Sequence, residues 1–69
     1  MTLGQKLKIQ MIKAGIRNKS LSKATGMTAA RLSNYLADRR EPSIRDLEKL
    51  ARALETDLNY FAQEPFEAV

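Results

Sequence analysis

The chain contains no cysteine and no histidine, and in 69 residues this absence removes most of the devices that hold a small domain together. Disulfides, zinc fingers, thiol nucleophiles and imidazole acid–base catalysis all need these residues. A domain of this size buries only about 60% of its unfolded surface, so it depends on efficient apolar packing. We therefore expect one domain around one apolar core, with no metal site, no cofactor and no catalytic residues.

Apolar residues recur at helical spacing, and we expect Gly and Pro to fall only where helices end. The spacing predicts a first helix over residues 3–14, followed by Gly15 as a left-handed C-cap. Its apolar face consists of Leu3, Leu7, Met11 and Ala14, with Ile12 beside them. A second helix is predicted over 18–25, ending at Gly26 and burying Leu21, Ser22 and Ala24.

Three further helices, with a loop between the first two of them, complete the pattern. Thr28 is a good N-cap for a helix over about 29–37, in which Leu32, Tyr35 and Leu36 face inward. Residues 38–42 are polar, end in Pro42 and predict a loop. Ser43 then caps a fourth helix, with Asp46 at a capping-box position, and its apolar stripe is Ile44, Leu47, Leu50, Ala51 and Leu54. Asp57 caps a last short helix that packs through Leu58, Tyr60 and Phe61, and with no hairpin signal the class is all-α.

The charge is distributed unevenly along the chain. Residues 1–40 carry nine basic residues and one acidic residue, whereas residues 41–69 carry three basic and seven acidic residues. The first part has a net charge of +8 and the second of −4, within a total of +4. This asymmetry is typical of a nucleic-acid-binding face opposite a solvent or partner face, although a basic solvated surface has the same charge.

Two short helices joined at Gly26 are the most informative feature. Gly26 supplies a positive φ, the small Ser22 lets the helices cross closely, and Leu21, Met27 and Leu32 lock the pair into one wedge. With the loop Arg39-Arg40-Glu41-Pro42-Ser43 and the segment 47–54 that follows, this series resembles the phage-repressor and Cro-like family of helix-turn-helix domains, the XRE family, over nearly the whole chain.

The resemblance implies a compact five-helix fold of the lambda-repressor type over residues 1–62, DNA binding through the third helix, and a homodimer. Phosphate contacts are then expected from Asn18, Thr28, Arg39 and Arg40, and Lys19 is also expected at the DNA-binding surface. Base edges are expected to meet Ala29, Ala30, Ser33 and Asn34, with Asn34 able to pair with adenine. For Arg31 two alternatives stay open, a contact with a guanine or a phosphate, or plain exposure to solvent. Where some relatives keep a buried ion pair, this chain has Met11 and Leu36, for which we expect direct packing.

Several alternatives stay open at this point. A restriction-modification controller or an antitoxin-type regulator uses similar domains, and the two alanines at 29 and 30 also fit a protein-interaction module that has lost base readout. The segment 63–69 is a tail that could contact a second subunit through Phe66 and Val69. We expect a cytoplasmic protein with no membrane segment, no secretory signal and no small-molecule effector.

Overall fold

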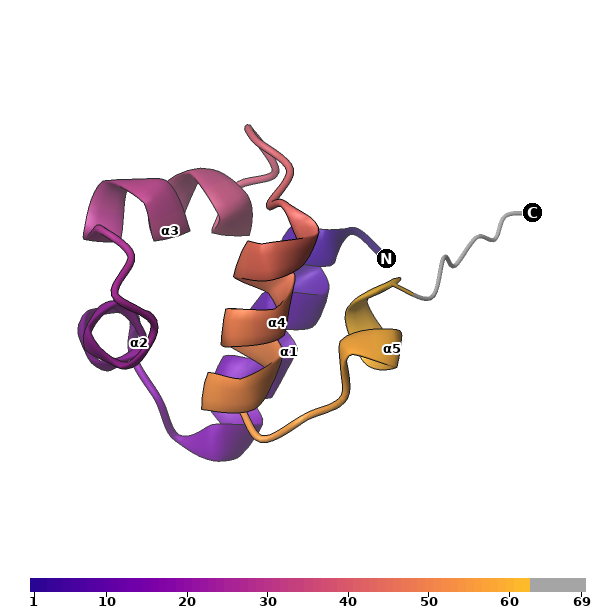
Figure 1. The fold of residues 1–69 in the computed structure, drawn as a ribbon, viewed down its shortest axis with the longest axis horizontal. Helices are drawn as coiled ribbons and strands as arrows, with labels where there is room; N and C mark the ends of the chain where they lie inside the picture. Colours follow the sequence, from indigo (N-terminus) through magenta and orange to yellow (C-terminus); the bar gives the residue numbers. More distant parts are fainter. Residues whose placement is uncertain (63–69) are drawn as a thin grey trace.

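The computed structural model describes residues 1–62, and within this range the chain forms helices and no strand, as the all-α prediction requires. The helices are α1 (Leu3–Ala14), α2 (Asn18–Thr25), α3 (Ala29–Leu36), α4 (Ile44–Ala53) and α5 (Leu58–Ala62) (Figure 1). None of them is long and apolar enough to cross a membrane. The predicted subunit contact of residues 63–69 lies outside the described residues.

Local capping determines where the helices begin and end. The Thr2 hydroxyl accepts a hydrogen bond from the Gln5 N–H at 3.1 Å, and the Gln5 side chain accepts one from the Thr2 N–H at 2.9 Å. Gly26 ends α2 in the left-handed region with φ 76°, as predicted. Thr28 caps α3, which ends at Leu36, one residue earlier than predicted.

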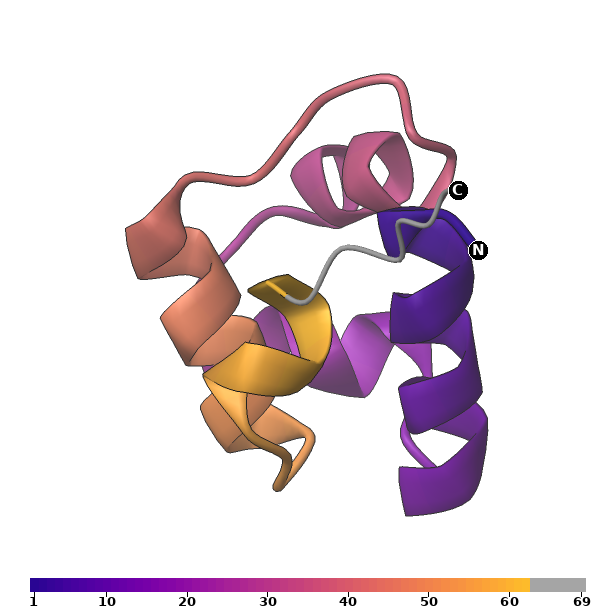
Figure 2. The same ribbon diagram turned by 90° about the vertical axis from the view of Figure 1, so that its right-hand side faces the viewer.

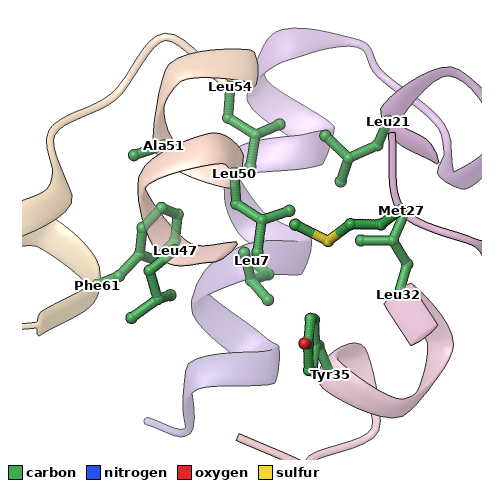
Figure 3. Packing of buried hydrophobic residues seen from close by; sticks show 10 residues of the cluster. All are labelled: Leu7, Leu21, Met27, Leu32, Tyr35, Leu47, Leu50, Ala51, Leu54 and Phe61. Carbon is green, nitrogen blue, oxygen red and sulfur yellow. The ribbon is translucent and has the colours of Figure 1, made fainter. Parts of the chain in front are cut away.

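Side chains from all five helices and from the turn after α2 meet in one apolar core (Figure 3). The core consists of Leu7, Leu21, Met27, Leu32, Tyr35, Leu47, Leu50, Ala51, Leu54 and Phe61. Leu7, Leu21, Leu32 and Leu50 are fully buried. Because Leu32 and Tyr35 are both part of this core, the inner side of α3 is fixed and its opposite side faces outward.

Helix α3 lies along one edge of the molecule in both ribbon views, with no other helix beyond it (Figures 1 and 2). Its inner side packs on α1 and α2. The loop that follows α3 rises on the outer side of that same edge in each view. Helix α3 and this loop therefore form one outer edge of the fold.

Some apolar residues that we expected to be buried are exposed. Ile12 is 79% exposed and Ile44 is 62% exposed, and Ala14 and Ala24 are exposed as well. Ile12 and Ala14 belong to the last turn of α1, and Ile44 is the first residue of α4. Helical periodicity predicts a face but not how far along that face the core extends, and here the core ends before the helices do.

The first turn of α1 packs closely against the end of α3 through Gly4. This glycine lies within a helix, so the expectation that Gly falls only at helix ends is wrong. A Cβ atom on Gly4 would lie 2.3 Å from the Leu36 carbonyl oxygen and 2.8 Å from Asp38 Oδ2. The Gly4 N–H donates to Asp38 Oδ1 at 2.9 Å. The absence of a side chain at residue 4 thus allows α1 to hold the C-terminal end of α3.

Candidate nucleic-acid interface

The turn between α2 and α3 is held by side-chain hydrogen bonds. Ser22 Oγ donates to the Met27 carbonyl oxygen at 2.5 Å. Thr25 Oγ1 donates to the Leu21 carbonyl oxygen at 2.8 Å and accepts from the Met27 N–H at 3.3 Å. Thr25 is buried, and these bonds satisfy its hydroxyl. The turn therefore fixes α3 relative to α2 as a rigid unit.

The outward face of α3 carries small and polar side chains. Thr28, the N-cap, accepts a hydrogen bond from the Arg31 N–H at 3.1 Å and is exposed. Ala29 and Ala30 are exposed, whereas Ser33 and Asn34 are half-buried. Four of the predicted site residues, 29, 30, 33 and 34, are spaced to share one face of the helix. A face built in this way lets the helix backbone approach a partner closely.

The N-terminus of α2 and the C-terminal end of α3 border a common surface pocket. Asn18 is the first residue of α2, and the preceding Arg17 makes no side-chain capping bond, so the first N–H groups of the helix keep no side-chain acceptor there. Asn18 Oδ1 is buried and has no hydrogen-bond partner within residues 1–62. Asn18 and Leu36 line one surface pocket together, and Lys19 is exposed.

The same pocket bears on the predicted contact between Met11 and Leu36. Both residues are half-buried, pack against the core and line this pocket. Their direct contact stays a prediction. Whether or not the two side chains touch, both are apolar and cannot form the ion pair that we expect in some relatives.

The loop after α3 begins with a chain reversal at Asp38, whose φ of 60° lies in the left-handed region. The Asp38 N–H donates to the Tyr35 carbonyl oxygen at 3.1 Å and the Arg39 N–H to the Asn34 carbonyl oxygen at 2.9 Å, which is the Schellman pattern of a helix C-terminus. Arg39 and Arg40 follow directly and are exposed. The reversal thus places two cations at the C-terminal end of α3.

Arg31 has a partner within the chain. Its Nη2 lies 2.6 Å from Asp46 Oδ2, and its Nε donates to the Tyr35 hydroxyl at 3.2 Å. The Tyr35 hydroxyl in turn donates to Asp46 Oδ2 at 2.5 Å. The Arg31 side chain is 51% exposed and the Asp46 side chain only 5%. This cluster of Arg31, Tyr35 and Asp46, the inter-helix cluster, joins α3 to the first turn of α4, and neither sequence alternative for Arg31 included it.

Ionisation of the inter-helix cluster follows from these bonds. The Tyr35 hydroxyl and then the Arg31 guanidinium hold the pKa of Asp46 below its ordinary value, against the opposing effect of burial. Hydrogen bonds to Tyr35 and Asp46 raise the pKa of Arg31. Asp46 is therefore a carboxylate and Arg31 a cation at neutral pH, so the ion pair is intact there.

Comparison with known proteins shows which family has this arrangement of helices. The family model described as helix-turn-helix matches residues 7–61, most of the chain. The chain belongs to the helix-turn-helix family. Its predicted XRE-type membership is thereby confirmed, and α2, the turn at Gly26 and α3 are its helix-turn-helix unit. No curated protein matches the chain.

A solved structure agrees with the fold. The DNA-binding domain of the P22 C2 repressor, determined in solution by nuclear magnetic resonance, superposes with a TM-score of 0.87 at 22% sequence identity. The match covers 97% of this chain and 88% of that domain. It confirms the predicted five-helix fold around the helix-turn-helix unit.

Residues that orient the helix-turn-helix unit were harder to find from sequence than the residues on its surface. Asp46 looked like the second member of a capping box, and its N–H does donate to Ser43 Oγ at 3.1 Å. Its carboxylate, however, turns to Tyr35 and Arg31 on α3. The residue type at position 46 was the sign of this second role, because a capping box favours Glu or Gln there and the Asp side chain is one methylene shorter.

Proposed function

We propose that the chain is a sequence-specific DNA-binding transcription regulator that inserts α3 into the major groove and binds a pseudo-palindromic operator as a homodimer. The observation that carries this proposal is the outward face of α3, with Ala29 and Ala30 exposed on it and Arg39 and Arg40 at its end. A major groove about 12 Å wide admits one α-helix. A helix at the edge of a small domain, with no other helix beyond it, suits that geometry.

Base contacts in this proposal come from the side chains on that face. The methyl groups of Ala29 and Ala30 suit apolar contact with thymine methyl groups, and they leave space for the backbone to descend into the groove. Ser33 and Asn34, one turn later, supply hydrogen-bonding groups for base edges. The readout is thus apolar at the start of α3 and polar towards its end.

Phosphate contacts come from groups around this face. Asn18 and Lys19 lie in the first turn of α2, and Thr28 caps α3, so N–H groups and helix dipoles favour anions at both places. Arg39 and Arg40 add charge at the other end of α3. Any phosphate contact by Arg31 uses guanidinium N–H groups that Tyr35 and Asp46 leave free.

The test is selection from a random duplex library at about physiological salt, followed by salt titration on the selected site. We expect a symmetric motif with half-sites about one helical turn, roughly 34 Å, apart. Asn34→Ala should lose about five- to 150-fold in affinity, the range of one bidentate base contact. Asn59→Ala, at an exposed position on α5, is the matched control and should bind as the parent does. Binding that weakens with salt but enriches no motif would contradict the proposal.

Salt-dependent binding without an enriched motif would favour a different function, a protein-interaction module that retains the fold. Ala29 and Ala30 motivate this alternative, because neither side chain can hydrogen-bond a base. Among DNA-binding functions, a restriction-modification controller and an antitoxin-type regulator use the same surface. The genes beside this one distinguish those contexts.

A further inference from the structure

Asn34 and Arg39 form a side-chain pair at the C-terminal end of α3. The chain reversal at Asp38 folds residue 39 back, so that the Asn34 carbonyl oxygen accepts from the Arg39 N–H at 2.9 Å and from the Arg40 N–H at 3.4 Å. The Arg39 side chain also bonds to Asn34, because its Nε donates to Asn34 Oδ1 at 3.0 Å. Asp38 is itself held by the Gly4 N–H, so the backbone of the pair is anchored on α1.

This pairing decides which hydrogen-bonding groups Asn34 can offer. Because Arg39 Nε–H is only a donor, the amide atom that faces it must be the oxygen, and the Nδ2 amino group points elsewhere. The guanidinium keeps its remaining N–H donors, and the amide keeps both donors of Nδ2. Together the two side chains present donors, and the one free lone pair of Oδ1 lies beside a cation.

We propose that the Asn34–Arg39 pair acts as one unit and selects guanine in the major groove at the base pair that meets the end of α3. This inference rests on the proposed function. Guanine presents two acceptors there, N7 and O6, which match a unit made of donors. Adenine presents the acceptor N7 beside the donor N6–H₂, and the donor would meet the N–H groups of Arg39. The adenine pairing expected from Asn34 alone requires its Oδ1 as an acceptor, and this oxygen already accepts from Arg39 Nε, which leaves one lone pair beside the cation.

Arg40 provides a matched control. It is the next residue, carries the same charge, is exposed, and makes no side-chain hydrogen bond within residues 1–62. A cation in this position acts on phosphates, independently of sequence. Arg39 and Arg40 therefore differ in the proposed role although they are neighbours of one type.

The experiment repeats the library selection with the parent chain, Arg39→Ala and Arg40→Ala, and checks by thermal melting that all three are folded. The parent should select guanine at one base pair in each half-site, the base pair that meets the end of α3. Arg39→Ala frees Oδ1, so the preference should change from guanine to adenine by about five- to 150-fold. Arg40→Ala should keep the guanine, lower affinity for all sequences alike and reduce the salt slope by about one.

Three results would overturn the inference. A parent motif with adenine at that base pair, or an Arg39→Ala motif identical to that of Arg40→Ala, would refute it while leaving the regulator proposal intact. If the parent enriches no motif at all, both proposals fail. Loss of guanine in Arg39→Ala, with the rest of the motif retained, is the result that supports it.

Discussion

Replacing Gly4 by alanine tests whether α1 approaches α3 as closely as the structure indicates. An added Cβ would lie 2.3 Å from the Leu36 carbonyl oxygen, which is backbone and cannot rotate away as a flexible side chain can. Gly4 is buried, and its N–H donates to Asp38 Oδ1 at 2.9 Å. The substitution must therefore push the first turn of α1 away from the end of α3.

Two opposing effects set the magnitude. In a helix without this contact, Gly→Ala stabilises by about 0.5–1 kcal/mol, because glycine loses more backbone entropy on folding. Overpacking costs about 1–3 kcal/mol, and a weakened hydrogen bond from Gly4 to the Asp38 carboxylate adds about 1.5 kcal/mol or more. The steric effect dominates, and we expect a net loss of about 1.5–4 kcal/mol. For a domain of this size that lowers Tm by roughly 6–30 °C.

Urea and thermal unfolding followed by circular dichroism measure this difference. Gly15→Ala is the comparison, because Gly15 has φ 69° with nothing within 4 Å of an added Cβ. Its cost of about 1 kcal/mol comes from backbone conformation alone. A Gly4→Ala protein as stable as the parent, or more stable, would refute the close approach, since helix propensity would then have prevailed.

Three further perturbations test the parts of the fold that carry the interface. Because the folded-state pKa of Asp46 is lowered, its ionised form stabilises the fold above the unfolded pKa, and this stabilisation is lost as the pH falls below about 4. Asp46→Asn should flatten the dependence of urea midpoints on pH between 7 and 3. Equal slopes for the parent and this variant would contradict the ion pair. Asp38→Asn keeps an acceptor for the Gly4 N–H and tolerates the left-handed backbone, so it should unfold near the parent, whereas Asp38→Ala should lose about 1–3 kcal/mol by thermal melting. Leu50→Ala should cost about 2–5 kcal/mol because Leu50 is fully buried, whereas Ile44→Ala, at a residue 62% exposed, should stay within about 0.5 kcal/mol; similar denaturation midpoints for the two would place the core wrongly.

Features that depend on neighbouring residues could be predicted from the sequence. The bounds of α1 and α2 agree with those predicted, and Thr28 caps α3 as expected. A glycine in the left-handed region or a hydroxyl at an N-cap acts within one turn of the chain, so its signal is local. The surface residues of α3 follow from the same reasoning, because the inward positions of a capped helix determine the outward ones.

Contacts between distant elements could not be predicted in this way. Gly4 approaches Leu36 and Asp38 across more than thirty positions, and Asp46 meets Arg31 across fifteen. A lone Asp or Gly has several roles that are locally acceptable, and only the packing of the helices selects one of them. Arg31 illustrates this, since it shares a helix with residues that we propose to face bases, yet its side chain turns toward α4.

The orientation of α3 depends on residues that are not on its outward face. The turn at Ser22 and Thr25 fixes its beginning, Asp46 holds Arg31 and Tyr35 in its middle, and Gly4 with Asp38 holds its end. A helix in the major groove must deliver its side chains to base edges within hydrogen-bond range, and a tilt moves all of them together. Changes at Gly4 or Asp46 should therefore weaken binding to every operator by a similar factor and leave the preferred sequence unaltered, whereas changes at Asn34 or Arg39 should alter the sequence itself. Under the proposed function, the two patterns separate residues that orient α3 from residues that contact bases.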